Sequence, residues 1–375
     1  MILLRSGVAR GDDTPHVLRG HRGQIFAVKL SDDGSRVASC SRDGTIKIWD
    51  AVSGNEIQSF RDPDRESSGA SPWVIAFVPH GTGIVSAGPS LRREIDGDPL
   101  RGGFHEFVGT TINVWEPSRG QSIRCCRFES SLPRGVASSR DGSLIAFSNE
   151  RLDVKVWDVA KGIVTASSLG PKGEVGGSDG TWGFDEGVRR FVAVTRSELP
   201  LPGVDGRPPM MRPGRLVLCD LATSKVRTIA DPDGGGYGSV ALSRDGRTIS
   251  TVLYRKPEQA AELQFLDFET GEISKAYQVE RMIDLSCLVF SPDGKFLIAS
   301  HGSGELLITD RISGRQFRER LKYGGRVRAL AFLDGLKVRV VVGGSGLTDE
   351  RDPITSNLLP KPLMVFDFKM PLMSP

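Results

Sequence analysis

The sequence predicts an all-β protein, a single seven-bladed β-propeller whose blades are four-stranded antiparallel sheets. Three observations lead to this fold. A strand that ends in an acidic residue recurs seven times, the spacing inside several copies is identical, and the last copy lacks a strand that the N-terminus can supply. Radial repetition lets each small sheet bury both of its faces and leaves only short open edges.

The third strand of each copy defines the repeat. In the first copy it alternates apolar and polar residues, and in every copy it is mainly apolar and ends in Asp or Glu. The seven strands are IKIWD ending at Asp50, INVWE at Glu116, VKVWD at Asp158, LVLCD at Asp220, LQFLD at Asp267, LLITD at Asp310 and LMVFD at Asp367. In five of the first six copies a Gly follows four residues after the acid, and Ser224 stands there in the fourth copy. This pattern indicates a turn into a fourth strand.

The spacing locates the insertions. In three copies the terminal acid stands 17 positions after the Asp of the first turn: Asp50 after Asp33, Asp158 after Asp141 and Asp310 after Asp293. In the other copies this interval is longer, and the extra residues fall between the second and third strands. The insertions cover Gly88–Thr110, Arg196–Gly214, a short piece at Arg255–Ala260, and Gly344–Lys361.

The two ends of the chain complete one blade. The seventh copy ends at PLMVFDF without a fourth strand, and the segment PHVLRG (Pro15–Gly20) stands directly before the first copy. We therefore expect the N-terminal strand to complete blade seven, since an open ring would leave unpaired strand edges. The propeller then spans residues 15–375. Residues 1–14 form a leader that is either disordered or the remnant of a signal segment.

The first copy resembles the WD-repeat β-propeller family. Gly20-His21 followed by Trp49-Asp50 matches the Gly-His and Trp-Asp signature of that family, and the resemblance extends over most of the chain. It implies a buried hydrogen-bonded network of His21, Asp43, Trp49 and either Ser39 or Ser41. Buried imidazole and indole groups need such partners. The same residues suggest a catalytic serine, but a nucleophile inside a packed blade is inaccessible, so we interpret them as structural.

No sequence motif points to catalysis. The chain contains no P-loop, dinucleotide-binding, nucleophile-elbow or HExxH pattern. Its five His residues are scattered over different copies, and its five Cys residues show no CxxC pairing, so we expect neither a metal nor a cofactor. The Gly-rich stretches GGSDGTWG and DPDGGGYG are interpreted as tight turns at the joints between blades.

The insertions are the best functional lead. Strands alternate in direction, so the loops between second and third strands rise from the same rim as the loops between blades. They carry the aromatic, Met and Arg residues that protein interfaces favour. The partner-binding candidates are Arg92, Arg93, Phe104 and Phe107 in the first insertion, and Met210, Met211 and Arg212 in the second. Neutral variation in tolerant loops is the alternative explanation.

The sequence therefore predicts a non-catalytic scaffold that binds other proteins or peptides. The alternative is a propeller enzyme or small-ligand binder with its site at the central channel. A net charge of +3 provides no strong field for nucleic acid, and no apolar run is long enough to span a membrane. We expect a monomer unless it joins a complex. The default location is the cytoplasm, with export if the N-terminus is a truncated signal peptide.

Overall fold

The computed structural model describes most of the chain. The described residues are 15–61, 72–78, 83–89, 92–94, 105–107, 109–116, 121–129, 132–168, 170, 174–176, 182–197, 214–231, 233–255, 260–279, 285–301, 304–321, 327–333, 337–343, 347–351, 358–360 and 362–370. The expected leader, residues 1–14, lies outside them.

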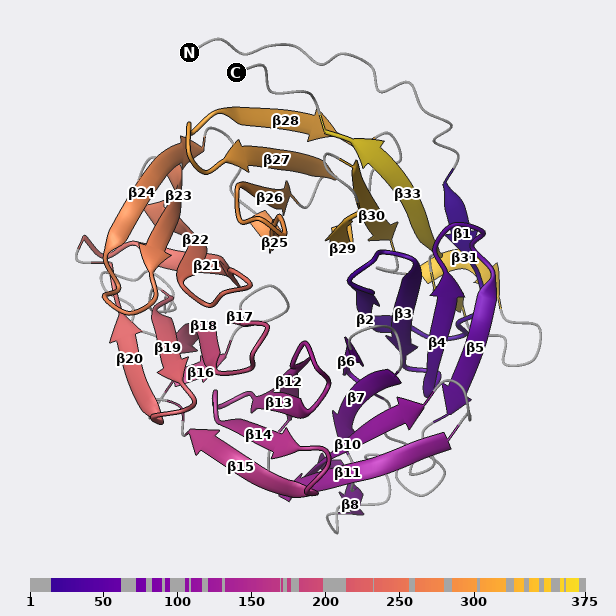
Figure 1. Ribbon diagram of the computed structural model, residues 1–375. Coiled ribbons are helices and arrows are strands. Elements are labelled where there is room, and N and C mark those ends of the chain that lie inside the picture. Colours follow the sequence, from indigo (N-terminus) through magenta and orange to yellow (C-terminus); the bar gives the residue numbers. More distant parts are fainter. Residues whose placement is uncertain are drawn as a thin grey trace, which may run out of the picture. The chain divides into compact units, whose positions relative to one another are not determined.

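All regular secondary structure of the described residues is β-strand, as the sequence predicted. The strands form seven antiparallel sheets, and these are the blades of a seven-bladed β-propeller (Figure 1). The described residues divide into two compact units. The closure unit contains residues 9–143, 159–162 and 328–375, and the mid-chain unit contains residues 144–158 and 163–327.

Three blades draw most of their strands from the closure unit. Blade one consists of β2 (Ile25–Leu30), β3 (Arg36–Ser41), β4 (Thr45–Asp50) and β5 (Glu56–Arg61). Blade two consists of β6 (Val74–Val78), β7 (Gly83–Pro89), β10 (Gly109–Glu116) and β11 (Gln121–Glu129). Blade seven consists of β29 (Val327–Phe332), β30 (Lys337–Gly343), β33 (Leu363–Lys369) and β1 (His16–Leu18).

The other four blades follow the same order. Blade three consists of β12 (Pro133–Ser138), β13 (Leu144–Asn149), β14 (Val154–Asp158) and β15 (Ile163–Ser168). Blade four contains β16 (Glu174–Gly176), β17 (Trp182–Phe184), β18 (Arg190–Ser197), β19 (Leu216–Asp220) and β20 (Lys225–Ile229). Blade five is β21 (Gly236–Leu242), β22 (Thr248–Arg255), β23 (Ala260–Asp267) and β24 (Ile273–Val279), and blade six is β25 (Leu285–Phe290), β26 (Phe296–His301), β27 (Glu305–Asp310) and β28 (Gln316–Arg320).

The predicted closure of blade seven is confirmed. Strand β1 pairs antiparallel with β33, with His16 opposite Val365 and Leu18 opposite Leu363. Leu18 and Leu363 are buried in a core that blades seven and one share, together with Trp49. The two ends of the chain thus form one sheet, and burial of Leu18 holds the short strand in register.

Blade four departs from the expected four strands. Its inner edge is divided between β16 and β17, and both pair with β18. We expected the stretch GGSDGTWG at a joint between blades. It instead spans the sequence from the end of β16 into β17 of blade four. Its Gly176 ends β16, its Trp182 begins β17, and the residues between them are outside the described part. Several Gly residues cannot pack a side chain, which makes a continuous inner strand unfavourable here.

The turn after the third strand needs a left-handed residue. Four of the predicted Gly residues have a positive φ there: Gly54 (75°), Gly162 (67°), Gly271 (76°) and Gly314 (74°). In blade four, Ser224 takes the same conformation with a φ of 56°. The turn geometry is thus retained where the glycine is missing, at the steric cost that a Cβ atom brings. Among the described residues, no helix exists that is long and apolar enough to cross a membrane.

Candidate functional site

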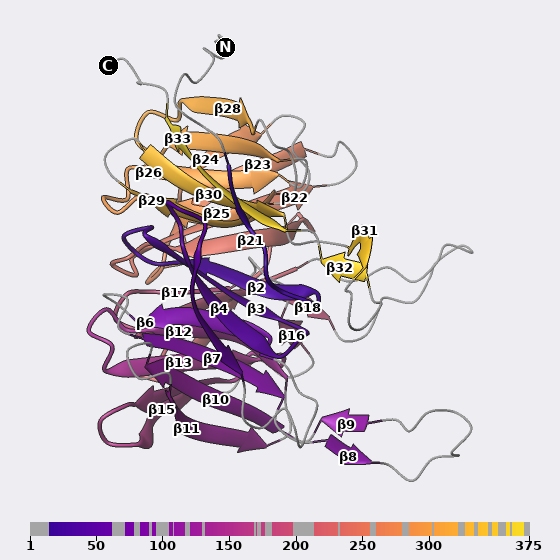
Figure 2. The same ribbon diagram turned by 90° about the vertical axis from the view of Figure 1, so that its right-hand side faces the viewer.

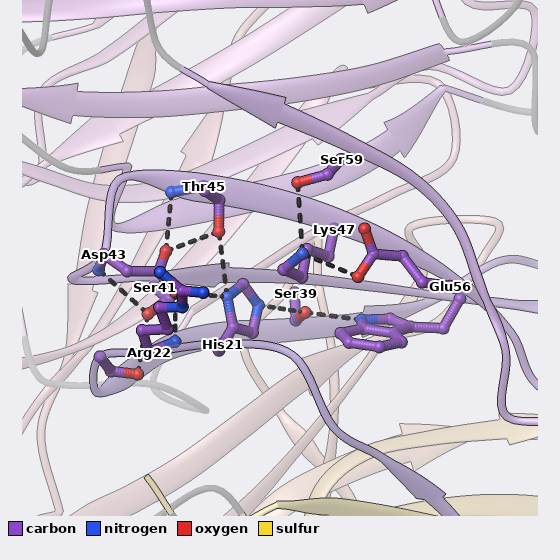
Figure 3. Close-up of polar contacts among 11 residues, drawn as sticks. His21, Arg22, Ser39, Ser41, Asp43, Thr45, Lys47, Glu56 and Ser59 are labelled. Carbon is purple, nitrogen blue, oxygen red and sulfur yellow. Dashed lines mark hydrogen bonds and ion pairs between the residues drawn. The ribbon is translucent and has the colours of Figure 1, made fainter. Parts of the chain in front are cut away.

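The predicted network of blade one is present. His21 Nδ1 donates to Asp43 Oδ2 at 3.0 Å, and His21 Nε2 lies 2.7 Å from Ser39 Oγ (Figure 3). Ser39 Oγ also accepts a hydrogen bond from Trp49 Nε1 at 2.8 Å. Because an indole N–H can only donate, the Ser39 hydroxyl directs its own hydrogen to His21.

The structure decides between the two candidate serines. Ser39 is the network residue, whereas Ser41 donates to the carbonyl of Gly23 at 2.8 Å. The prediction missed Thr45. Its Oγ1 donates to Asp43 Oδ1 at 2.5 Å and lies 3.1 Å from His21 Nδ1. A hydroxyl two residues after a turn Asp is a common turn feature, and it was the available signal for Thr45.

The network holds Asp43 in its ionised form. Burial of the carboxyl opposes its charge, but hydrogen bonds from His21, Thr45 and the backbone N–H of Arg22 outweigh that effect, so the pKa of Asp43 lies well below its usual range. The backbone N–H of Arg22 is 2.7 Å from Asp43 Oδ2. The carboxylate therefore ties the loop before β2 to the turn between β3 and β4.

This geometry copies the hydrogen bonds of a Ser-His-Asp triad, but the site is closed. Ser39 has no exposed surface and His21 is 8% exposed. Trp49 occupies the remaining face of the Ser39 hydroxyl. A substrate carbonyl cannot reach this oxygen, so the arrangement serves packing and hydrogen bonding in the blade.

Other blades keep only parts of the network. In blade two, Trp115 Nε1 donates to Ser86 Oγ at 2.8 Å, which reproduces the Trp49–Ser39 contact. In blade three, Phe147 lies opposite Lys155 and so takes the strand position of Ser39 beside Trp157. The full network is thus found in blade one, as the sequence predicted.

The terminal acids have a local role that the sequence pattern did not reveal. Asp50 Oδ1 accepts hydrogen bonds from the backbone N–H groups of Val52 (3.0 Å) and Ser53 (2.7 Å). Asp267 and Asp310 accept equivalent bonds from the residues that follow them. The acid at the strand end therefore caps the turn into the fourth strand.

Asp367 makes different contacts, and the fourth strand of its blade comes from the N-terminus. Its carboxylate instead receives Arg339, with Nε at 2.5 Å and the second guanidinium nitrogen at 2.8 Å, and Lys337 lies at 3.1 Å. Arg339 is 7% exposed and also donates to the carbonyl of Gly34 in blade one at 2.7 Å. This buried contact links blade seven to blade one.

A similar arginine contact links blades four and five. Arg190 stands opposite Asp220, as Arg339 stands opposite Asp367, and donates to the carbonyl of Gly246 at 2.9 Å. Gly34 and Gly246 occupy the same place in their first turns. Arg190 also contacts the carboxylate of Glu269, which is largely exposed.

The first and last insertions contain short hairpins. β8 (Arg92–Glu94) pairs with β9 (His105–Phe107), and β31 (Leu347–Arg351) pairs with β32 (Leu358–Pro360). Both hairpins belong to the closure unit and project from the same side of it (Figure 2). The backbone register places Arg92 opposite Phe107 and Arg93 opposite Glu106.

The remaining interface candidates lie outside the described residues. They are Phe104, Met210, Met211 and Arg212. No group of three or more metal-binding side chains gathers anywhere in the part of the chain that the structure covers.

Comparison with known families agrees with this geometry. The model of the family "WD domain, G-beta repeat" matches residues 13–50, which include β1 and the network of blade one. The chain thus contains a WD repeat at residues 13–50, within a seven-bladed β-propeller. Its first repeat carries the full sequence signature, and its other repeats share the sheet topology.

Curated relatives of this WD-repeat protein match part of its length. It is 27% identical over 164 residues to the guanine nucleotide-binding protein subunit beta-1 of Drosophila melanogaster, over 43% of this chain and 42% of the relative. It is 26% identical to the corresponding beta subunit of Lymnaea stagnalis, over 43% of this chain and 41% of the relative. A longer match, 22% identical over 334 residues, is to telomerase protein component 1 of Rattus norvegicus and covers 81% of this chain and 12% of the relative. The match thus covers less than half of each of these relatives.

Proposed function

We propose that this protein is a non-catalytic scaffold that binds protein partners through the rim carrying its insertions. The observation that carries the proposal is the placement of the two inserted hairpins on one side of the closure unit (Figure 2). Neither β8–β9 nor β31–β32 joins the sheet of a blade. Structure added outside the repeat, on one rim, is typical of loops kept for binding.

The residue types of the first insertion favour a protein partner. Arg92 and Phe107 are directly opposite in the β8–β9 register. Arg and aromatic residues supply much of the binding energy of protein interfaces. Arg93 and Phe104 belong to the same insertion, and Met210, Met211 and Arg212 are proposed as separate binding residues in the insertion of blade four. Two similar relatives are named as subunits, which means that they work in an assembly with other chains.

The absence of catalysis is part of the proposal. The one Ser-His-Asp arrangement of the described residues is closed by Trp49, and the sequence contains no established catalytic motif. A scaffold needs only a rigid support and an exposed surface. The blades supply the support, and the insertions supply the surface.

Trimming the insertions tests the proposal. Replacing residues 90–108 and 344–361 by short Asp-Gly turns, such as the one at Asp43-Gly44, should leave the unfolding temperature nearly unchanged, because both segments lie outside the blade sheets. Quantitative affinity capture from the native cells should then lose the partners that the intact protein retains. Replacing residues 256–259, which connect β22 to β23 in the sequence, by an Asp-Gly turn is the matched control. Undiminished capture by the trimmed protein would show that the rim is not the binding surface.

A further inference from the structure

The hairpin β8–β9 prolongs the pairing of the two middle strands of blade two. Thr110 lies opposite Pro89 in the β7–β10 register, and Phe107 lies opposite Arg92 in the β8–β9 register. Two residues separate these pairs on each strand, between 89 and 92 and between 107 and 110, so one register runs through both. The hairpin is therefore an extension of the ladder of blade two that projects beyond the blade (Figure 2).

The edge of this extension on the side of β6 carries no further strand among the described residues. We call it the inner edge. The pairing of β6 with β7 ends at Val74 and Ala87, and β8 pairs with β9 alone. A two-stranded ribbon is marginally stable by itself, and its open backbone groups are a template for another strand. A third strand along β8 would therefore stabilise the hairpin.

The backbone register shows which groups of β8 point to the inner edge. The carbonyl of Ala87 accepts a hydrogen bond from the N–H of Trp73 at 2.9 Å, so it points to the side of β6. Backbone groups of successive strand residues point to alternate edges. Pro89 and Arg93, two and six positions after Ala87, share its direction. The missing N–H of Pro89 thus leaves the β7–β10 pairing intact, as is usual for Pro in strands, and the N–H of Arg93 points away from β9.

Blade four already has an additional strand at the equivalent edge. β18 is the second strand of blade four, as β7 is of blade two, and it runs past its last pair with β19, which joins Val194 and Leu216. β16 pairs antiparallel with this extension of β18, with Val175 opposite Arg196. This fold therefore accommodates a short extended segment beside a second strand that leaves its blade.

We propose that a protein partner adds an extended segment to the inner edge of β8, antiparallel to it, as β16 is added to β18. This inference rests on the proposed scaffold function and adds the mode of binding. In strand addition, main-chain hydrogen bonds give affinity and alternate side chains give specificity. Opposite charges are favoured at directly opposite positions, so the segment that fits best carries an acid opposite Arg93 and a base opposite Glu94.

A synthetic strand tests the inference by fluorescence anisotropy. The probe is the labelled peptide Thr-Val-Lys-Glu-Thr-Val-Thr with blocked ends, in which Glu falls opposite Arg93 when Lys falls opposite Glu94. The comparison probe has the same side chains but carries N-methyl groups on Glu and both Val residues, whose N–H groups would face β8.

Three variants separate the backbone from the side chain. Arg93→Pro removes the N–H at the inner edge, and Arg93→Gln keeps that N–H but removes the charge. Glu106→Pro is the matched control, because Glu106 lies opposite Arg93 and its N–H points to the other edge of the hairpin.

The intact protein should bind the probe about tenfold or more tightly than the methylated peptide, because each lost hydrogen bond weakens binding. The amide of Arg93 should become protected from hydrogen exchange when the probe binds. Arg93→Pro should lose about tenfold or more in affinity, Arg93→Gln less than about fivefold, and Glu106→Pro should keep the affinity. Protection of the Arg92 and Glu94 amides, which point to β9, checks that the hairpin persists in Arg93→Pro. If it does not persist, the methylated probe tests the same bonds in the unchanged protein.

Four results would overturn the inference: no binding of the probe, equal binding of the methylated peptide, equal losses in Arg93→Pro and Glu106→Pro, or a loss in Arg93→Gln as large as in Arg93→Pro. The scaffold function can fail separately. If trimming the hairpins abolishes partner capture but Arg93→Pro retains it, the rim binds its partners without strand addition. If the probe binds as expected but the trimmed protein keeps its partners, the edge accepts a strand and the scaffold proposal fails.

Discussion

Arg339 should stabilise the closure of blade seven more than its equivalent, Arg190, stabilises the contact between blades four and five. Arg339→Met removes two charged hydrogen bonds to Asp367 and leaves the buried carbonyl of Gly34 without this donor. The Asp367 carboxylate keeps its ion pair with Lys337 in this variant. Loss of a bond to a charged group and an unpaired buried acceptor each cost about 1–3 kcal/mol, partly offset by the guanidinium no longer being desolvated, so we expect about 2–3 kcal/mol.

Removing the carboxylate of the pair should lower the free energy of unfolding more than removing the arginine. Asp367→Asn leaves the buried Arg339 cation without its carboxylate, and breaking a buried ion pair in this way costs about 3–5 kcal/mol. Arg190→Met also removes a donor from the carbonyl of Gly246, but its carboxylate partner, Glu269, is 62% exposed, and an exposed ion pair contributes only about 0–1 kcal/mol. Arg339 and Arg190 occupy the same strand position, but replacing them should therefore lower the free energy of unfolding by different amounts.

Urea unfolding of the single and double variants measures these costs. Arg339→Met and Asp367→Asn together should cost less than their sum by about 1–3 kcal/mol, because they break one shared interaction. Burial opposes the charge of Asp367, but hydrogen bonds from Arg339 and Lys337 outweigh it and lower its pKa. The stabilisation that the Asp367 carboxylate contributes is therefore complete above its unfolded-state pKa, near 4, and is lost as the pH falls below that value. Strict additivity, or equal costs for Arg339→Met and Arg190→Met, would refute this reasoning.

Four further outcomes are expected. Deletion of residues 1–20 should lower the unfolding temperature strongly by removing β1, and an unchanged temperature would contradict closure by this strand. Trp49→Ala should cost about 3–5 kcal/mol in chemical denaturation, as a large-to-small change at a side chain that is 1% exposed. Ser224→Gly should stabilise by up to about 1 kcal/mol by relieving a positive φ, and destabilisation would mean that its hydroxyl contact to Ser167 matters more. Hydrogen bonds from Ser139 and Ser143 lower the pKa of Asp141 to about 2, so stability should fall between about pH 4 and 2, and Ser139→Ala should weaken that dependence on pH.

The repeat and its turns could be predicted because they are local. The apolar third strand, the acid at its end and the Gly four residues later all act within one hairpin, and the structure shows the β4–β5 pairing and the positive φ of Gly54. The network of blade one could be predicted because buried His and Trp side chains need partners. Ser39 and Ser41 stand two residues apart on the same sheet face, so alternation alone could not separate them.

The contacts that could not be predicted join distant parts of the chain. Arg339 and Gly34 are 305 residues apart, and nothing near either residue marks the other. The divided inner edge of blade four was missed for a different reason. A Gly-rich stretch marks a break in a strand and a turn between blades equally well, so the pairing of both β16 and β17 with β18 had to be observed.

The full network of blade one lies next to the strand that closes blade seven. β1 has only three residues, and it reaches β33 from the other end of the chain, so no hairpin sets its register. His21 follows β1 after two residues, and its bond to Asp43 fixes the exit of that strand to the turn between β3 and β4. Arg339 fixes the opposite turn of the same blade through Gly34. Hydrogen bonds are directional, so the His21–Asp43 bond adds to the burial of Leu18 in holding the register of β1. Inside the chain, covalent hairpins set the register, and the other blades can lose parts of the network.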